Sequence, residues 1–428
     1  GRLAIFVRDP TSITWAAPVV FLRSPSGRLF SLPAPPAGVP AVPEEILRYI
    51  IDFSEFIAEK SAGFVGRSWL FAAVDRFLET NPCGYFLLRG VPGVGLTAFM
   101  AEMSRRRRCI HHFNIRAQAI TRTDQFLGSV CAQLIAQYRL EYPTLPPEAR
   151  QDSRFLEHIL TIVSRQLPAG QRAVILVSGL DQAEPDPLGG AGTNALHLPI
   201  TLPRGIYFVV SARTFAPALH IDTQYQILEV GPASSDNMAD VAAFVAAKMG
   251  SPSIDAFITA QHLDRQSFIA MITARSEGNF LYLRHLLAEI ESGAFERQTL
   301  NFLPQGLYHF YEDLWRRMRD RDELRWISDH LPVMAILTNL AEPASVKRIS
   351  AFSGIGEGRV LAVLRDWESL ITVSQVELLG RHEQRYQLYH SSFREFIATR
   401  SYDASEPDLA AASQRLAGAL WKELESGE

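Results

Sequence analysis

The feature that most constrains this fold is a glycine-rich turn at residues 90 to 97, which lies between a strand pattern and a helix pattern. The turn reads Gly-Val-Pro-Gly-Val-Gly-Leu-Thr; it follows the apolar run Tyr85 to Leu88 and opens a helix at Thr97. Glycines let backbone N–H groups turn inward, and a helix N-terminus presents positive partial charge to an anion. Strand, loop and helix in this order are the context that the phosphate-binding pattern GxxxxGK[ST] requires.

This loop predicts a nucleotide whose phosphates lie on the amides of Gly93 to Thr97. One position departs from the pattern, because Leu96 stands where lysine would reach the β and γ phosphates. Losing a charged donor costs ~1.5–3 kcal/mol and removes charge neutralisation in the transition state. We therefore expect nucleotide binding to survive, hydrolysis to be weak or absent, and the Thr97 hydroxyl to hold Mg²⁺. A glycine turn that only joins strand to helix is the alternative. The residues expected to bind nucleotide here are Gly90, Pro92, Gly93, Val94, Gly95, Leu96, Thr97 and Ala98.

The pattern around the loop predicts an α/β fold. Short apolar runs alternate with helical stretches from Gly84 to about Val230, which is typical of a parallel sheet covered on both faces. The expected strands are Tyr85 to Leu88, Ile110 to Ile115, Ala173 to Val177 and Ile206 to Ser211, and the expected crossover helices are Thr97 to Arg107, Asp124 to Tyr138 and Phe155 to Gln166.

After Asp236 the strand patterns stop, and an all-α domain is expected. Its amphipathic helices are predicted at roughly 238 to 249, 265 to 275, 280 to 292 and 308 to 319. From Glu323, three helical runs precede two strand-like pieces, Leu370 to Val373 and Arg385 to Tyr389, and then another helix, an order that favours a winged helix. The predicted divisions are 1 to 43, 44 to 232, 233 to 321, 322 to 402, and a helical segment from 403 to 428.

A second motif, residues 173 to 182, runs from an apolar strand into a polar turn, where P-loop proteins place a metal-binding aspartate. Two registers compete. If the strand ends at Val177, the metal-facing residue is Ser178; if the chain stays extended to Leu180, it is Asp181. The first register is favoured because Gly179 promotes a turn. In that register the metal site has no carboxylate, and Gln182 stands where an activating glutamate is expected.

A cation follows the strand that begins at Gly205. This strand ends in Ser211-Ala212-Arg213, and the carboxyl ends of neighbouring parallel strands open into one crevice. Arg213 could therefore contact the γ-phosphate, and a solvated arginine is the alternative. Asp181 and Arg213 are the candidate catalytic residues, with Thr97 and Asp181 as candidate metal ligands.

Composition excludes several other classes. The formal net charge is −4, with 42 basic and 46 acidic residues, so bulk charge indicates neither nucleic acid nor membrane as a partner. The candidate second helix of the winged helix, Gly356 to Trp367, has only Arg359 and Arg365 as cations. The apolar runs are far shorter than the ~20 residues that cross a bilayer. The three cysteines lack metal-ligand spacing, which favours a reducing, cytoplasmic location.

These motifs together resemble the NACHT family of STAND signalling NTPases over about residues 60 to 400. The phrase Gly63 to Arg67 resembles the family's opening motif, which implies that Val65, Gly66 and Arg67 cradle adenine. Residues 177 to 183 resemble DGLDEA with the first aspartate and the glutamate replaced, and Arg213 matches the sensor arginine. Glu277 to Tyr282 resembles the phrase that opens a helix of the helical domain. Residues 388 to 396 resemble the winged-helix motif, which implies that His390 contacts the β-phosphate of ADP.

The resemblance implies a switch that responds to ATP or ADP, with Mg²⁺ as a cofactor. It further implies self-association on activation, sensor and effector domains elsewhere in the chain, and a role in bacterial defence or programmed cell death. Two alternatives stay open. One is a working ATPase that takes its missing cation from Arg89 or Arg107, and the other is a nucleotide-free assembly scaffold.

The first 43 residues precede the region that carries these motifs. The stretch Ser31 to Pro43 is rich in proline and alanine and predicts a linker. Pro18 to Leu22 and Arg28 to Phe30 favour a hairpin, and Trp15 to Pro25 resembles the last strand of a CHAT caspase-like domain. Glu44 to Glu59 has the periodicity of a helix.

Overall fold

The structure is a computed structural model that describes residues 42–185, 193–213, 219–293, 303–340, 342–378, 381–401 and 418. The chain divides into two units, Gly1–Val42 and Pro43–Glu428, and only the second is described below. The predicted N-terminal hairpin and CHAT-like strand, and nearly all of the predicted segment 403 to 428, lie outside the described residues.

The predicted parallel sheet is confirmed. It has five strands in the order β2-β3-β4-β1-β5. Four of them match the expected strands, and the fifth was not predicted, because its outward residues are mostly exposed and its pattern is not continuously apolar. The strands are β1 (Gly84–Gly90), β2 (Ile110–Phe113), β3 (Ala173–Ser178), β4 (Ile206–Arg213) and β5 (Tyr225–Val230).

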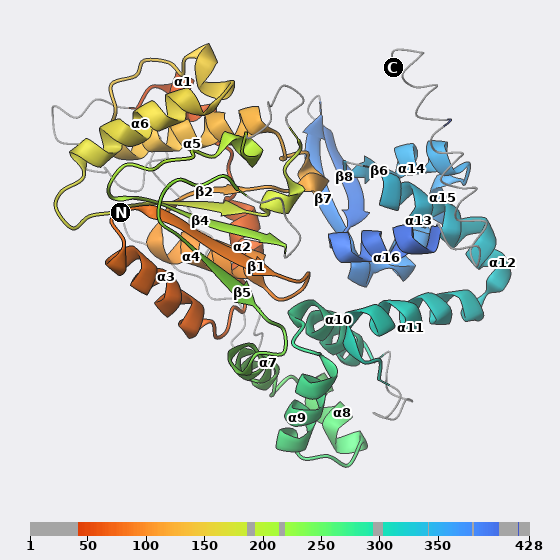
Figure 1. Ribbon diagram of the computed structural model, residues 1–428. Coiled ribbons are helices and arrows are strands. Elements are labelled where there is room, and N and C mark those ends of the chain that lie inside the picture. Colours follow the sequence, from red (N-terminus) through yellow and green to blue (C-terminus); the bar gives the residue numbers. More distant parts are fainter. Residues whose placement is uncertain are drawn as a thin grey trace, which may run out of the picture. The chain divides into compact units, whose positions relative to one another are not determined.

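Helices cover both faces of this sheet (Figure 1). On one face lie α2 (Ser54–Ser61), α3 (Ser68–Thr80) and α4 (Leu96–Arg107); on the other lie α1 (Glu44–Leu47), α5 (Thr123–Tyr138) and α6 (Ser153–Gln166). Four short 3-10 turns are described among the connections, at Arg116–Gln118, Pro147–Arg150, Leu180–Gln182 and Ala195–His197. The side of the sheet that faces α4 has an apolar centre, with Phe86, Leu88, Phe99 and Met100 completely buried.

The single helix predicted over Glu44 to Glu59 is wrong. The chain leaves helical geometry between α1 and α2, and the Asp52 carboxylate accepts a hydrogen bond from the Ser54 amide at 2.8 Å, which starts a new helix. Phe53 turns into the core at this break, where it is 2% exposed and its ring makes edge contacts with His112 and Phe113. Burying one phenylalanine outweighs the continuity of a short helix.

The region after the sheet is helical, as predicted. Its helices are α7 (Ser235–Ala247), α8 (Pro252–Ala260), α9 (Arg265–Arg275), α10 (Phe280–Glu291) and α11 (Gly306–Arg321), of which α8 was not predicted. Side chains of Ser234, Asp264 and Asn279 cap α7, α9 and α10. Within the described chain no single helix is long and apolar enough to cross a membrane; α7 and α8 pass that test only as a pair, bent by 102°.

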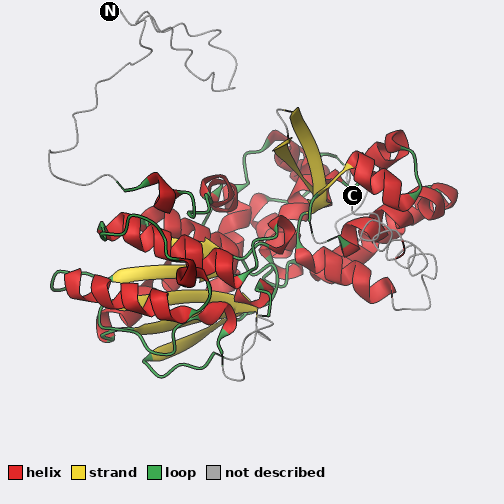
Figure 2. Ribbon diagram, turned by 90° about the horizontal axis from the view of Figure 1, so that it is seen from above, coloured by secondary structure: helices red, strands yellow, loops and turns green. Residues whose placement is uncertain are grey.

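A smaller antiparallel sheet lies among the last helices. Its strands β6 (Ala344–Ser345), β7 (Ile371–Leu378) and β8 (Arg381–Leu388) are ordered β6-β8-β7, and Figure 2 shows this sheet apart from the large one. The helical elements are α12 (Glu323–Arg325), a π-helical turn (Trp326–His330), α13 (Leu331–Asn339), α14 (Val346–Ser353), α15 (Glu357–Asp366), a 3-10 turn (Glu368–Leu370) and α16 (Ser391–Ser401). One buried hydrophobic cluster includes residues from Val241 to Ile397, on both sides of residue 321. The domain boundary expected at 321 therefore remains a prediction.

Candidate functional site

The glycine loop lies at the carboxyl end of β1, between β4 and β5. Gly90 is paired with Arg213 of β4 and with Val230 of β5. Gly93 and Gly95 have φ angles of +85° and +92°, which side chains rarely allow, and α4 begins directly after them at Leu96. In an open parallel sheet, ligands bind outside the carboxyl ends of the strands, and a helix N-terminus there favours an anion. The loop therefore has the place and the shape of a phosphate site.

The lysine position is filled by an apolar side chain that packs inward. Leu96 is partly buried against the cluster that includes Phe99 and Val94. A Cβ atom added to Gly90 would lie 3.5 Å from the Leu96 Cδ1 atom, so this side chain folds back along the loop. Thr97 and Ala98 occupy the first turn of α4 and are partly exposed.

Arg67, predicted to cradle adenine, is the cation that the structure brings to the loop. Its Nη2 atom donates to the Val94 carbonyl, and its guanidinium lies 4.8 Å from the centre of the Phe280 ring. Asp240 of α7 is 3.6 Å from its Nη1 atom. Burial lowers the pKa of Arg67 to about 10, and the Asp240 charge opposes that shift, so the guanidinium stays charged at neutral pH.

The rest of the opening phrase is held by the same aspartate. The Arg67 amide donates to Asp240 Oδ1 at 3.1 Å, and the Trp69 indole donates to Oδ2 at 2.9 Å. Gly66 has a φ of +77°, and a side chain there would collide with Asp240. Val65 is partly buried beside it.

The second motif turns at Gly179 instead of staying extended to Leu180. β3 ends at Ser178, and Gly179 has a φ of +73°. The Ser178 hydroxyl is 3% exposed and accepts a hydrogen bond from the Ser211 hydroxyl at 3.2 Å. Gln182 accepts only a long hydrogen bond, 3.4 Å, from the Arg116 amide. The position at the end of β3 thus offers a hydroxyl and no carboxylate.

The two candidate catalytic residues are brought together, but they contact each other. Asp181 Oδ1 accepts from the Arg213 amide at 3.1 Å, and Oδ2 lies 3.2 Å from Arg213 Nε. The rest of the Arg213 guanidinium reaches α16, where Nη2 donates to the Ser391 hydroxyl at 2.5 Å and Nη1 pairs with Glu395. Arg213 is therefore engaged by carboxylates on both sides.

His390 lies beside this arginine at the start of α16. Its Nδ1 atom accepts from the Ser392 amide at 3.1 Å, which places the proton of the neutral ring on Nε2. Burial, together with the positive charges of Arg213 and Lys60, lowers the pKa of His390 to about 4. At neutral pH the imidazole is uncharged and has one N–H to donate.

The two arginines suggested as substitutes for the lysine are engaged elsewhere. Arg107 pairs with Asp75 at 2.7 Å, at the opposite end of α4 from the loop, about 16 Å away at a rise of 1.5 Å per residue. Arg89 precedes the loop but is directed at Glu229 of β5, 3.9 Å away. In the described part of the chain, no group of three or more His, Cys, Asp or Glu side chains is arranged to hold a metal ion.

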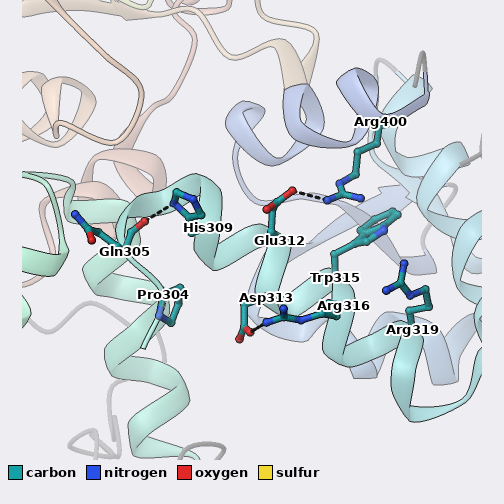
Figure 3. Close-up of a pocket in the computed structure, with 9 residues that line it drawn as sticks. All are labelled: Pro304, Gln305, His309, Glu312, Asp313, Trp315, Arg316, Arg319 and Arg400. Atoms are coloured by element: carbon teal, nitrogen blue, oxygen red, sulfur yellow. Dashed lines mark hydrogen bonds and ion pairs between the residues drawn. The ribbon is translucent and has the colours of Figure 1, made fainter. Parts of the chain in front are cut away.

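A separate pocket of about 440 Å³ lies along α11 and α16 and contains none of the predicted site residues (Figure 3). Its cations are already paired, Arg316 with Asp313 at 2.7 Å and Arg400 with Glu312 at 2.7 Å. We assign it no role in nucleotide binding.

Comparisons with known proteins identify similar structures only. No protein-family model and no curated protein matches the chain. A crystal structure of a STAND protein with a tetratricopeptide repeat sensor from Pyrococcus horikoshii aligns with 82% of this chain at 12% identity and a TM-score of 0.41. The aligned region is 44% of that protein's length. Two mutants of Thermotoga maritima RuvB align over 78% and 82% of this chain and 95% and 97% of their own, at 12% identity and TM-scores of 0.27 and 0.28.

The chain's own sheet and loop define the class. A parallel sheet whose first strand runs through a GxxxxGxT loop into a helix is the fold of a P-loop NTPase. Sequence reasoning did not identify Asp240, Asn279, Ser391 or Glu395 as part of this site. Asn279 had a local signal, since an asparagine before an apolar helical run is a typical N-cap, and Ser391 and Glu395 lie within the phrase at 388 to 396 that resembles the winged-helix motif.

Proposed function

We propose that this chain is a nucleotide-dependent switch of the STAND class that binds ADP or ATP on the glycine loop. The observation that carries the proposal is the double engagement of Arg213. This residue is paired with the first loop residue, Gly90, in the sheet, and its side chain joins Asp181 to Ser391 and Glu395 of α16. A γ-phosphate in the crevice competes for the same guanidinium, so the nucleotide state and the position of α16 are linked.

The nucleotide is expected to place its phosphates on the amides of Gly93 to Thr97 and its base near Val65, Gly66 and Arg67. These backbone donors do not depend on the missing lysine. Mg²⁺ prefers oxygen ligands and bridges phosphates, so the Thr97 hydroxyl is a fitting donor for it. Asp181 fits less well, because Arg213 already occupies its carboxylate. Fast hydrolysis is not expected, since Leu96 stands at the lysine position and the Asp181 carboxylate is paired with Arg213.

The C-terminal elements are proposed to form a winged helix that holds the closed state. Helix α13, strand β6, helices α14 and α15, and the β7–β8 hairpin follow one another in that order. The Nε2–H group of His390 is available to donate to a β-phosphate. Release of α16 is then the event that permits self-association and activation of an attached effector. The NACHT assignment and a role in bacterial defence belong to this proposal.

Calorimetric titration of the purified chain with ADP and with ATP, each with Mg²⁺, tests the proposal. Both should bind, and turnover should stay well below the ~1 per second of an ordinary ATPase. Thr97→Ala should weaken Mg²⁺-nucleotide binding. A folded sample that gives no heat and no thermal shift at millimolar nucleotide would refute a nucleotide switch and leave an assembly scaffold. Rapid turnover that Thr97→Ala abolishes would instead show an active ATPase.

A further inference from the structure

The outer side of the glycine loop is held by donors from outside the loop. The carbonyls of Pro92, Gly93 and Val94 accept, in turn, from Asn279 Nδ2 at 3.0 Å, from the Phe280 amide at 2.9 Å, and from Arg67 Nη2. We propose that this carbonyl clamp, with Asn279 as its positioning residue, sets the phosphate affinity of the loop and makes the start of α10 an obligatory part of the nucleotide site. This inference rests on the proposed function.

Asn279 is shaped for two tasks at once. Its Oδ1 atom accepts from the amides of Leu281 and Tyr282 at 3.0 and 3.1 Å and so caps α10. Its Nδ2 atom is thereby turned toward the loop and donates to the Pro92 carbonyl. A side chain on Gly93 would collide with Asn279, so the contact also requires glycine at that loop position.

The position of Asn279 beside the loop is fixed by contacts of the preceding residue, Gly278. The buried Asn237 of α7 donates to the Gly278 carbonyl at 2.9 Å and to the Pro232 carbonyl at 2.6 Å. Gly278 has a φ of +77°, and a side chain there would collide with the Pro232 backbone. The residue that reaches the loop is therefore positioned by polar contacts of the buried Asn237 side chain and has little freedom to move away.

The clamp determines which way the loop amides face. Each peptide plane carries its C=O and N–H on opposite sides, so the Pro92 and Val94 carbonyls held outward keep the amides of Gly93 and Gly95 directed inward, while the Val94 amide donates to the Val91 carbonyl at 3.3 Å. Leu96 supplies no charge to attract a phosphate, and Arg67, the cation that donates to the Val94 carbonyl of the loop, has a side chain that is only 3% exposed. The phosphate affinity of the loop then depends on the orientation of its amides. When α10 is not docked, the ligand itself must order the loop, and this ordering costs part of the binding free energy.

Asn279→Ser separates the two tasks of this side chain. Serine is a strong N-cap, so α10 keeps its first turn, but its hydroxyl is too short to reach the Pro92 carbonyl and adds no charge. The matched control is Asp264→Ser, which changes the N-cap of α9, a helix of the same region, where the cap accepts from the Ser267 amide at 2.9 Å. Three quantities are measured on both variants and on the unsubstituted chain: ADP affinity, adenosine affinity, and hydrogen exchange of the amides of residues 93 to 97 without nucleotide.

Loss of one neutral hydrogen bond corresponds to about 2- to 12-fold in affinity. We expect Asn279→Ser to weaken ADP binding by that factor, to leave adenosine binding unchanged, and to speed exchange of the loop amides, while Asp264→Ser does none of these. Unchanged exchange in Asn279→Ser would overturn the clamp. An equal loss for ADP and adenosine would also overturn it, because it would show that Asn279 only supports the helix. If the unsubstituted chain binds no ADP, the proposed function fails, while the exchange comparison still decides whether the clamp orders the loop.

Discussion

Removing one charge at the Arg213 bridge should release α16 by an amount that can be worked out from the structure. Glu395→Gln keeps the size of the side chain and ends its ion pair with Arg213. The Glu395 side chain is 52% exposed and that of Arg213 is 29% exposed, so the pair is a surface salt bridge worth ~0.2–1 kcal/mol. Because 1.4 kcal/mol is tenfold, the open population should rise about 1.4- to 5-fold.

Arg213→Ala should have a larger effect, because it also removes the contact with Ser391 of α16. This contact is partly buried, and a hydrogen bond to a charged group is worth ~1.5–3 kcal/mol. The expected shift is therefore about 10- to 150-fold. In Arg213→Ala the further change Glu395→Gln should have no effect, since its partner has gone.

The measurement is hydrogen exchange of the amides of α16, which reports the fraction of molecules in which this helix is released. Glu45→Gln is the matched control. The Glu45 side chain is also 52% exposed, and it is paired at 2.6 Å with Arg48, which lies only three residues further along the chain. The control should leave α16 unchanged. If Glu395→Gln and Arg213→Ala also leave α16 exchange unchanged, Arg213 does not restrain this helix, and the link between crevice and α16 is refuted.

Two further predictions follow from single sites. Leu96→Lys should tighten ADP binding by about 10- to 150-fold, which corresponds to the free energy of one hydrogen bond from a charged donor, and should raise turnover far less. Calorimetry measures the affinity and phosphate release measures the turnover. Equal gains in both would contradict the inference that the end of β3 offers no carboxylate for hydrolysis. Acid should destabilise the fold, because burial lowers the pKa of His112 and of His285 to about 3. Histidine in the unfolded chain titrates near 6.5, so below that pH the unfolded state binds more protons than the folded state. The free energy of unfolding is therefore at its full value above pH ~6.5 and falls by up to ~4 kcal/mol per histidine toward pH 3. Urea unfolding at pH 5 and 7 measures this, and His285→Phe, which keeps a ring against Phe310, should flatten the slope; an unchanged slope would exclude His285 as a source.

Much of the fold could be predicted because its elements are local. A buried strand such as β3 is a continuous apolar run, and α5 has its own length and periodicity, so both were expected within a few residues of their observed bounds. β5 was missed because its side chains at Tyr225 and Ile227 are 57% and 40% exposed, and an edge strand of this kind has no distinctive pattern. The break between α1 and α2 was missed because it depends on the tertiary burial of Phe53.

The site was less predictable, since its contacts join distant parts of the chain. Arg67 was expected to lie beside a base, and nothing in its neighbours indicates that its side chain meets Val94 and Asp240. The pairing of Arg213 with Glu395 joins residues 182 positions apart. A sequence pattern shows which residues can bind a phosphate, but it does not show which other residues of the fold contact them.

The leucine in the loop and the clamp behind it have one joint consequence. A lysine would attract phosphate whatever the position of α10, because a charge acts over several ångströms without precise orientation. With Leu96 in its place, the loop itself attracts phosphate through its amides alone, and amides act only when they face the ligand. Their orientation depends on Asn279 and Phe280, which belong to the helical region and not to the sheet. Under the proposed function, leucine at this position thus makes phosphate affinity conditional on helix docking, and by linkage a bound nucleotide strengthens that docking by the same free energy.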